Sequence, residues 1–292
     1  MTISRIALKS PAKINLFLHV EKNDKYGFHP LKTIMCPLRF GDFIDIQKSH
    51  KIALDIENDK DIELQANKQN LCYQALQAIC ETAQLKLTPH IQLQKNIPLE
   101  SGLGGGSSNA ACLLNCLDKL YNLNLDSAIL IKLASQIGKD VPFFLQEGPC
   151  YMEGYGDRVN KNIFLPSFYI LLVYPKTGLS TKKIFDIYDK SGFSSRTSLT
   201  VPQKFSNFED FINFLKTTRN DLEKIAIKEC PDTKSALHEI SSTNGVRLSR
   251  MSGSGSSCFG IYPTKKEALA GQIKIQNKFK HWKTYVTSPL YK

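Results

Sequence analysis

The first predicted strand of the chain has two different faces. Between residues 10 and 20 the side chains alternate, so that aliphatic residues point one way and a mixed polar and aromatic set points the other. The aliphatic set is Ile14, Leu16, Leu18 and Val20, and the mixed set is Lys13, Asn15, Phe17 and His19. Alternation with a period of two is typical of a β-strand. The mixed face would line a cleft or meet solvent, and the pattern alone slightly favours solvent.

The rest of the chain combines strand-like and helix-like spacings of apolar residues. Helical spacing predicts helices at residues 70–81, 110–120, 126–137, 207–217, 221–229 and 232–241. Strand-like runs lie at residues 31–35, 43–46, 52–56, 90–95, 150–152, 170–174, 246–251 and 258–262. Asn70 and Asp126 are placed as N-caps of their helices, and residues 191–203, which have low hydrophobicity, predict a mobile loop.

The order of these elements predicts an α+β protein of two domains. Strands and helices are mixed without the steady β-α-β alternation of a parallel sheet. The chain of 292 residues is long enough for two domains of ordinary size. The polar residues 160–162 favour a boundary between residues 1–160 and 161–292. Because ligands often bind between domains, we expect the active-site cleft there.

A glycine-rich stretch predicts an anion-binding loop. Residues 98–111 read Pro-Leu-Glu-Ser-Gly-Leu-Gly-Gly-Gly-Ser-Ser-Asn-Ala-Ala, between a predicted strand and a predicted helix. Glycines let a ligand approach backbone N–H groups, and a helix N-terminus attracts negative charge. The run lacks the lysine of a P-loop and the spacing of a dinucleotide-binding loop. A flexible linker is the alternative, but the apolar helix that follows at once argues against it.

Composition narrows the class of protein only moderately. A formal net charge of +11 favours anionic partners without choosing among them. Because the lysines are dispersed, we expect most of them to be solvated and expect no dedicated nucleic-acid surface. No signal core or bilayer-spanning stretch is present, so we expect a cytoplasmic protein without membrane attachment. The eight cysteines show no metal-binding spacing and predict buried free thiols.

Three segments, taken in order along the chain, resemble the motifs of the GHMP kinases, a family of small-molecule kinases. They are Ser10-Pro-Ala-Lys-Ile-Asn-Leu16, the glycine-rich stretch from Pro98 to Ala110, and Arg250-Met-Ser-Gly-Ser-Gly255. Taken by itself, the Gly/Ser run at residues 251–257 is better explained as the turn of a β-hairpin. The resemblance implies a ribosomal-protein-like N-terminal domain and an α/β C-terminal domain.

Further segments narrow the resemblance to one branch of the family. They are Gly27-Phe-His-Pro-Leu31, Gly41-Asp42, Gly138-Lys-Asp-Val-Pro-Phe143 and Asn220-Asp-Leu-Glu223. That branch belongs to the non-mevalonate route to isoprenoids. The resemblance implies phosphoryl transfer from ATP to the 2-hydroxyl of a methylerythritol unit that carries a cytidyl diphosphate, giving the 2-phosphate and ADP. ATP is the implied cofactor, with Mg²⁺ accompanying it and the magnesium ligands unassigned.

The resemblance implies two catalytic residues. Asp140 would take the proton from the acceptor hydroxyl, and Lys13 would lie beside Asp140 and the transferring phosphate. A lysine cation can keep a carboxylate ionised and stabilise charge on the phosphoryl oxygens, which matters because phosphoryl transfer depends on positioning and charge neutralisation. Without the resemblance, Asp140 would be interpreted as a turn carboxylate and Lys13 as an exposed strand lysine.

Binding residues follow from the same resemblance. On the ATP side they are Asn70, Lys95, Pro98, Leu99, Glu100, Ser101, Gly102, Leu103, Gly104, Gly105, Gly106, Ser107 and Ser108. Either serine of the last pair would place a hydroxyl near magnesium, and Asn70 could equally be a helix cap alone. On the substrate side, one aromatic would stack on the cytosine and one histidine would hydrogen-bond to it. The substrate-side residues are Asn15, Phe28, His29 and Thr181.

Three residues depart from the family pattern. Phe28 stands where tyrosine is usual and lacks its hydroxyl, so any hydrogen bond from that hydroxyl is lost. Lys139 replaces a small residue and would favour the ionised form of the following aspartate if it pointed inward. Ser101 replaces alanine or glycine, and we expect little consequence.

Other functions are compatible with parts of the pattern. A mevalonate or homoserine kinase of the same family would keep the phosphate loop but would not need the aromatic and histidine pair at residues 28 and 29. An RNA-associated protein of related fold would suit the positive charge, but it would not need Lys13, Asp140 and the glycine loop together. The small-molecule substrate is therefore the expected partner, and a homodimer is an assembly that the sequence leaves open.

Overall fold

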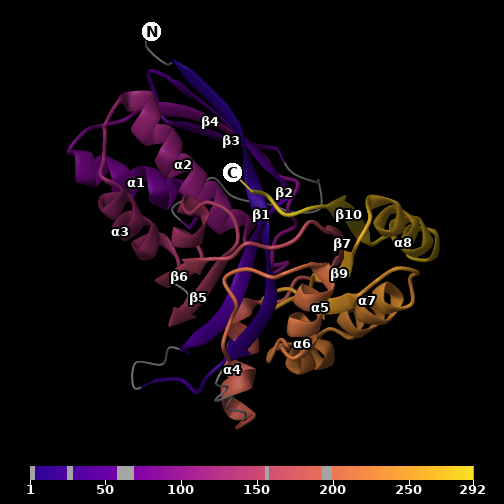
Figure 1. The fold of residues 1–292 in the computed structure, drawn as a ribbon. Helices are drawn as coiled ribbons and strands as arrows, with labels where there is room; N and C mark the ends of the chain where they lie inside the picture. The colour runs from indigo at the N-terminus through magenta and orange to yellow at the C-terminus, as the bar shows by residue number, and fades with distance from the viewer. Residues whose placement is uncertain (1–3, 25–28, 58–68, 155–157, 193–198, 292) are drawn as a thin grey trace. The chain divides into compact units, whose positions relative to one another are not determined.

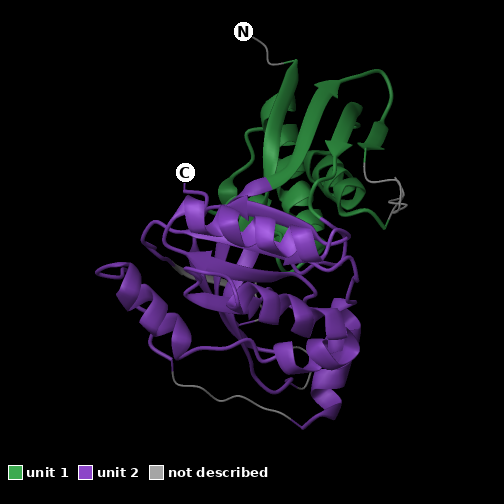
Figure 2. Cartoon of the chain, turned by 90° about the vertical axis from the view of Figure 1, so that its right-hand side faces the viewer, with its two compact units in different colours: residues 1–12, 41–97, 104–146 green, residues 13–40, 98–103, 147–292 purple. Residues whose placement is uncertain are grey.

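The computed structural model describes residues 4–24, 29–57, 69–154, 158–192 and 199–291 (Figure 1). The chain divides into two compact units (Figure 2). Unit 1 comprises Met1–Ala12, Gly41–Ile97 and Gly104–Gln146, and unit 2 comprises Lys13–Phe40, Pro98–Leu103 and Glu147–Lys292. The predicted domain boundary near residue 160 stays a prediction, although the polar residues that suggested it belong to strand β6 (Arg158–Asn162).

Unit 1 contains part of a six-stranded sheet, in which β4 lies between β3 and β2. Its strands are β1 (Arg5–Val20), β2 (Leu31–Lys48), β3 (Ala53–Glu57) and β4 (Pro89–Gln94), of which the first two continue into unit 2. Strand β4 pairs in parallel with β3, and antiparallel with β2, where Ile44 lies opposite Leu93. On the other edge of β2 lies β1.

Helices cover one face of the unit 1 sheet (Figure 2). They are α1 (Leu71–Ala83), α2 (Gly105–Tyr121) and α3 (Ser127–Ile137), followed by the 3-10 helix η1 (Pro142–Leu145). Ile44 and Leu93 on the covered face are buried, whereas Phe43 and Gln92 on the opposite face are exposed. The helices pack against one another through apolar stripes, which is how an amphipathic helix buries its surface.

Unit 2 is built around an antiparallel sheet in the order β10-β7-β9-β8. These strands are β7 (Tyr169–Tyr174), β8 (Leu248–Met251), β9 (Cys258–Tyr262) and β10 (Lys283–Thr287). Its helices are α4 (Thr181–Lys190), α5 (Phe208–Lys216), α6 (Glu223–Glu229), α7 (Pro231–Ser241) and α8 (Lys265–Lys278). Leu171, Val173, Ile240 and Ile275 are among its fully buried core residues. In the same unit β5 (Cys150–Gly154) pairs with the first half of β2 and with β6.

Most of the predicted elements are present, and several boundaries were wrong. Strand β1 begins at Arg5, five positions before the predicted start. The predicted strands at residues 31–35 and 43–46 are parts of the single strand β2. An added Cβ at Gly41, between them, would lie 2.1 Å from the carbonyl oxygen of Ser10, so this glycine lets β1 approach β2. Helix α2 begins at Gly105, five positions before the predicted start. The prediction missed this first turn because it consists of glycine and serine residues, which have low helix propensity.

Some elements had no counterpart in the sequence prediction. Helices α4 and α8 and strands β6 and β10 were not predicted. The low-hydrophobicity segment at residues 191–203 lies partly outside the described residues. All eight cysteines are free, and Cys36, Cys72, Cys116, Cys150, Cys230 and Cys258 are buried, which confirms the expectation for those six. Within the part of the chain that is described, every helix is too short or too polar to traverse a lipid bilayer.

The mixed face of β1 is buried, so the preference for solvent was wrong. Lys13, Asn15 and His19 are at most 4% exposed, and Phe17 is fully buried. This face is covered by residues of unit 2 that are distant from it along the chain. The ring of Phe17 lies 6.1 Å from that of Phe214 in α5, edge to face. A period-two pattern reports that two faces differ but not what covers each of them.

Replacing Gly41 by alanine should destabilise the protein. The new methyl group would collide with the backbone of Ser10, and the strands would have to separate, which we expect to lower the free energy of unfolding by about 2 kcal/mol. Chemical denaturation measures this. Gly106→Ala is the matched control, because its Cβ would lie 3.4 Å from Leu71 Cδ1 and should cost little. Equal unfolding free energies for the two variants would contradict the argument.

Candidate functional site

The glycine-rich loop ends in the N-terminus of helix α2. Gly104 is the N-cap, with a φ of 71°, and no side chain caps the helix. The first N–H groups of a helix lack partners within the helix and carry partial positive charge. Gly105, Gly106 and Ser107 form this first turn. The linker interpretation is therefore wrong, because the stretch leads directly into α2, and anion binding at this N-terminus stays a prediction.

The glycines are required by close packing. At Gly102, where φ is 75°, an added Cβ would lie 2.3 Å from the carbonyl oxygen of Ser252. At Gly105 it would lie 3.0 Å from Ile97 Cγ2 and 3.1 Å from Lys95 Nζ. Larger residues would push apart the elements that meet at the loop.

The two serines after the glycines differ in their surroundings. Ser108 is fully buried, and its hydroxyl accepts a hydrogen bond of 2.7 Å from Ser10. Ser107 is partly exposed. Of the two candidate hydroxyls for an incoming metal and nucleotide, that of Ser107 is therefore the accessible one.

Lys95 lies beside this helix N-terminus in an ion pair with Asp42. The Lys95 side chain is 5% exposed and that of Asp42 is fully buried. Asp42 Oδ1 accepts hydrogen bonds from the backbone N–H groups of Asn96 and Ile97, both at 2.7 Å, and Oδ2 accepts one of 3.0 Å from Asn109 in α2. The buried carboxylate is thus satisfied by the end of β4 and by α2 together, as a buried charge requires.

In unit 2, Lys13 starts a chain of buried hydrogen bonds. Its Nζ donates to Asn15 Oδ1 at 2.6 Å, and Asn15 Nδ2 donates to Thr33 Oγ1 at 3.0 Å. The Thr33 hydroxyl donates in turn to the carbonyl of Phe17 at 2.6 Å. Because Thr33 has to accept from the amide nitrogen, the Asn15 oxygen faces the ammonium. Lys13 is therefore a held, buried cation, and its interpretation as an exposed strand lysine was wrong.

The second Gly/Ser run is a hairpin turn, as predicted, and it also contacts the glycine loop. Met251 pairs with Cys258 at its base. The Ser252 hydroxyl donates to the carbonyl of Gly102 at 3.1 Å, and the N–H of Ser257 donates to the carbonyl of Ser101 at 3.1 Å. The turn therefore holds the backbone of Ser101 and Gly102, in the first half of the glycine loop, through hydrogen bonds within unit 2.

The segment at residues 220–223 holds this turn. Asn220 Nδ2 donates to the carbonyls of Met251 and Gly253 at 3.0 and 2.8 Å. The Glu223 carboxylate accepts from the N–H of Met251 at 2.9 Å. Burial raises the pKa of Glu223 above its ordinary 4.5, although this hydrogen bond opposes the rise. The part of the branch motif at these residues is thus structural.

Arg250 fastens the preceding strand. Its guanidinium is buried and donates to the carbonyls of Leu16, Leu215 and Thr218 and to the Thr218 hydroxyl. Burial lowers its pKa to about 10, with the Glu223 carboxylate opposing that effect. Arginine suits this role because its planar fork supplies several donors at once.

Asp140 and Asn70 lie at turns in unit 1. Asp140 is partly buried in the turn between α3 and η1, and the neighbouring Lys139 is exposed. Asn70 is the N-cap of α1, where its Oδ1 accepts from the N–H of Cys72 at 3.0 Å. The cap prediction is confirmed. Contact with adenine stays a prediction for Asn70, as does the role of base for Asp140.

The substrate-side residues are described in part. Phe28 lies outside the described residues. His29 Nδ1 donates to the carbonyl of Glu21 at 2.8 Å, and its Nε2 lies 3.1 Å from Asp189 Oδ1. The His29 ring lies 5.2 Å from that of Phe185. Thr181 begins α4, and its hydroxyl hydrogen-bonds to Ser254 at 2.8 Å. Binding of the cytosine by His29 stays a prediction.

The sequence analysis missed several residues that hydrogen-bond to the predicted site residues, because no sequence pattern marked them for that role. Asp42 was noted only as part of a motif, and no role was predicted for its carboxylate. An aspartate directly after a strand glycine was the available signal. Ser10 and Thr33 carried none, because hydroxyls are common on strands. Ser252 lay in the run interpreted as a simple turn.

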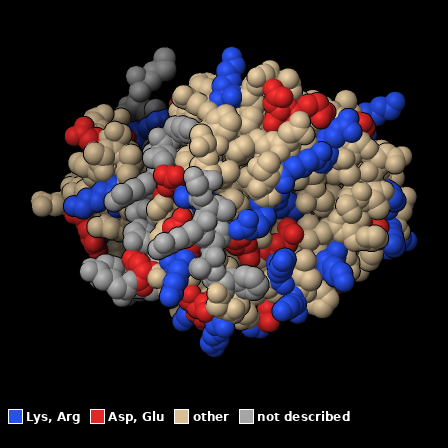
Figure 3. Space-filling view, turned by 60° about the horizontal axis from the view of Figure 1, so that its bottom comes forward, with Lys and Arg blue, Asp and Glu red and all other residues tan. Residues whose placement is uncertain are grey.

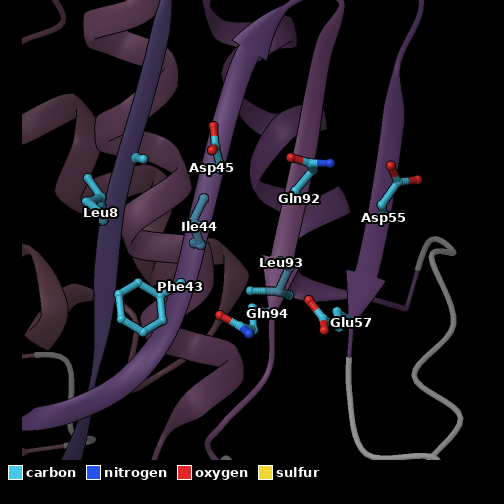
Figure 4. A pocket seen from close by; sticks show the side chains of 10 residues that line it. Leu8, Phe43, Ile44, Asp45, Asp55, Glu57, Gln92, Leu93 and Gln94 are labelled. Atoms are coloured by element: carbon cyan, nitrogen blue, oxygen red, sulfur yellow. The ribbon is translucent and has the colours of Figure 1, made fainter.

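A separate groove of about 510 Å³ lies on the open face of the unit 1 sheet (Figure 4). Its polar lining residues are Asp45, Asp55, Glu57, Gln92 and Gln94. Arg5 hydrogen-bonds to Asp45 at 2.8 Å, and His90 lies 2.6 Å from Asp55. Asp45 and Asp55 thus already have a cationic or imidazole partner, and none of the predicted site residues lines the groove.

Charges of both signs are interspersed on the face that Figure 3 shows. Lysine and arginine side chains stand among aspartates and glutamates there, so this face has no uniform basic field. A mixed face of this kind steers anionic ligands weakly. The expected absence of a nucleic-acid surface on the whole chain stays a prediction.

Comparisons with known proteins bear on the whole chain. Residues 70–148 match the GHMP kinases N terminal domain, and residues 203–281 match the GHMP kinases C terminal domain. A 4-diphosphocytidyl-2-C-methyl-D-erythritol kinase from Wolbachia pipientis wMel is 34% identical over 283 residues, which are 94% of this chain and 95% of that protein. The protein of the same name from Vesicomyosocius okutanii subsp. Calyptogena okutanii (strain HA) is 35% identical, covering 97% of this chain and 95% of its own.

Solved structures agree. A crystal structure of 4-(cytidine 5'-diphospho)-2C-methyl-D-erythritol kinase has a TM-score of 0.77 and 27% identity, and the match covers 97% of this chain and 99% of that one. A homoserine kinase from Cytophaga hutchinsonii ATCC 33406 has a TM-score of 0.69 at 15% identity, and covers 100% of this chain and 96% of its own. At that identity the second match shows the fold alone.

Buried His19 should make stability depend on pH. Burial lowers its pKa below the ordinary 6.5, and Arg219, Arg250 and Lys32 act in the same direction, while Asp221 opposes them. The unfolded chain therefore binds a proton that the folded chain refuses, and stability should fall as the pH decreases below about 6.5. The advantage of the wild type over His19→Gln in unfolding free energy should shrink between about pH 7.5 and 5.5. A constant difference across that range would refute the assignment.

Proposed function

The chain belongs to the 4-diphosphocytidyl-2-C-methyl-D-erythritol kinases of the GHMP family, and from this premise we propose how its residues carry out the reaction. The reaction is ATP-dependent phosphorylation of the 2-hydroxyl of 4-diphosphocytidyl-2-C-methyl-D-erythritol, a step of the non-mevalonate route to isoprenoid precursors. The observation that supports it best is the family match over 94% of the chain, together with the glycine loop that opens α2. Relatives in mevalonate and homoserine metabolism share the fold at 15 to 17% identity.

We assign the proton transfer to Asp140. A general base has to take the hydroxyl proton as the oxygen attacks the terminal phosphorus of ATP. Asp140 lies in a turn directly before the buried Val141, Pro142 and Phe143, which anchor its backbone. Asp140 is partly buried and not enclosed in the core.

Lys13 supplies fixed positive charge in this mechanism. Its ammonium is buried and oriented by Asn15, so it loses little freedom when phosphoryl oxygens arrive. A preorganised cation stabilises the charge spread over the transferring group. Asn15, which shares that strand face, is proposed to contact the acceptor.

The glycine loop is proposed to bind the ATP phosphates. Backbone N–H groups of Gly105, Gly106 and Ser107 point from the helix N-terminus, and Lys95 adds an ammonium beside them. The rest of the ATP-side prediction, from Pro98 to Leu103 and at Asn70, belongs to the same proposal.

Magnesium suits this site as a companion of ATP. Among the described residues no cluster of His, Cys, Asp and Glu is arranged to hold a metal ion by itself. Mg²⁺ bound to a nucleotide keeps waters and phosphate oxygens as ligands and needs few protein groups, and the accessible hydroxyl of Ser107 is the candidate. Such an ion would neutralise charge on the β- and γ-phosphates.

On the acceptor side, His29 and Phe28 are proposed to read the cytosine, and Thr181 to contact the substrate. His29 Nδ1 donates to the Glu21 carbonyl, and this hydrogen bond orients the ring for its proposed contact with the base. Phe28 keeps an aromatic face for stacking.

An ADP-release assay tests the function directly. The wild type should release ADP with 4-diphosphocytidyl-2-C-methyl-D-erythritol and not with mevalonate or homoserine. Cytidine nucleotides should compete with the acceptor, because the base is part of what is recognised. Turnover of mevalonate or homoserine at a comparable rate would overturn the proposed substrate.

Asp140→Asn should lower turnover by roughly 100-fold or more while ATP binding and folding stay nearly unchanged, because it removes the base and keeps the size of the side chain. Asp126→Asn is the matched control. Asp126 is exposed at the start of α3 and its side chain makes no cap hydrogen bond, so its turnover should equal that of the wild type. Full activity of Asp140→Asn would remove this residue from the mechanism.

A further inference from the structure

We propose that Asp42 is a positioning residue for ATP, acting through Lys95. It holds the Lys95 ammonium beside the first turn of α2, where the phosphates of the nucleotide arrive. The inference rests on the proposed function, and it gives a role to a carboxylate that the mechanism above does not use.

The contacts of Asp42 divide between its two oxygens. Oδ1 receives the backbone N–H groups of Asn96 and Ile97 and shapes the end of β4. Oδ2 receives Lys95 Nζ and the side-chain amide of Asn109. One oxygen therefore serves the backbone, and the other serves a cation and helix α2. The two functions can be separated by chemistry that changes the charge but keeps the shape.

Electrostatics explains why a carboxylate is needed. Lys95 Nζ lies 3.1 Å from the point where a Cβ of Gly105 would be, next to the positive end of α2. A cation there is repelled by the helix dipole, and its flexible stem could carry it into solvent. The buried Asp42 charge offsets that repulsion before any nucleotide is bound. An arriving phosphate then meets both an ammonium and a helix N-terminus that are already in place.

An amide could not take over this role. Asparagine at position 42 would keep an acceptor for the N–H groups of Asn96 and Ile97. It would present an NH₂ group to Lys95 Nζ, donor against donor, and would remove the compensating charge. The loss should therefore fall on the placement of the lysine and much less on the end of the strand.

The test is a double-mutant cycle on ATP binding. Asp42→Asn, Lys95→Met and the double variant are compared with the wild type by calorimetric titration with ATP and by steady-state kinetics with both substrates. Asp118→Asn is the matched control. Asp118 is in the same helix as Asn109 but near its C-terminal end, and its carboxylate accepts from the N–H of Leu125 at 2.9 Å.

Asp42→Asn should weaken ATP binding roughly tenfold and leave the KM of the cytidyl substrate within about twofold, since the two sites are read separately. In the Lys95→Met background the same change should have no further effect on ATP binding. Asp118→Asn should bind ATP like the wild type. If the loss of ATP affinity in the double variant equalled the product of the losses in Asp42→Asn and Lys95→Met, the inference would be overturned. An equal rise in KM for both substrates would likewise indicate a general structural role.

Failure to fold does not leave the question open. If Asp42→Asn alone is unstable, Lys95→Met is compared with the double variant. The inference then requires that these two variants bind ATP with equal affinity. It also requires that the double variant is at least as stable as Lys95→Met. A double variant that unfolds where Lys95→Met folds would contradict it.

A wild type that binds ATP but does not phosphorylate the cytidyl substrate would refute the proposed function while the coupling on ATP stands. A wild type that does not bind ATP would refute both.

Discussion

The buried carboxylate of Asp42 is the constraint on which the organisation of unit 1 depends. An unpaired charge with no exposure would cost several kcal/mol, so its partners have to remain in place. They are the backbone at the end of β4, the ammonium of Lys95 and an amide of α2. Strand end and helix start are thereby tied to one point, and the glycine loop is the chain between them. Its helical half is therefore connected to both elements through Asp42.

In unit 2, neutral and charged side chains supply the hydrogen-bond partners that buried backbone groups require. Asn220 and Glu223 bind backbone groups of Met251 and Gly253 in and beside the Gly/Ser turn. Arg250 binds backbone carbonyls of β1 and at the end of α5. The turn in turn bonds to the backbone of Ser101 and Gly102. Small residues are needed on both sides, since an added Cβ at Gly102 would strike Ser252. Part of what marks this family in sequence is therefore the support of the loop and not its chemistry.

Local signals predicted much of the fold, and long-range contacts account for what was missed. Helix α1 with its Asn70 cap and the hairpin β8-β9 follow from periodicity and turn residues. The start of α2 was placed too late because glycine has low helix propensity, which tertiary packing overrides here. The burial of Lys13 was missed because residues near position 252 and helix α5 cover that strand face. The resemblance singled out Lys13 as functional, whereas spacing alone could not.

The central claim is that a cradle of backbone N–H groups holds ATP while an aspartate frees the acceptor oxygen for attack. Its most direct test follows the γ-phosphate itself. With γ-labelled ATP and the cytidyl substrate, phosphorus NMR of the product should place the label in an ester at the 2-hydroxyl of the methylerythritol unit. Label found as inorganic phosphate, or at another hydroxyl, would contradict the account.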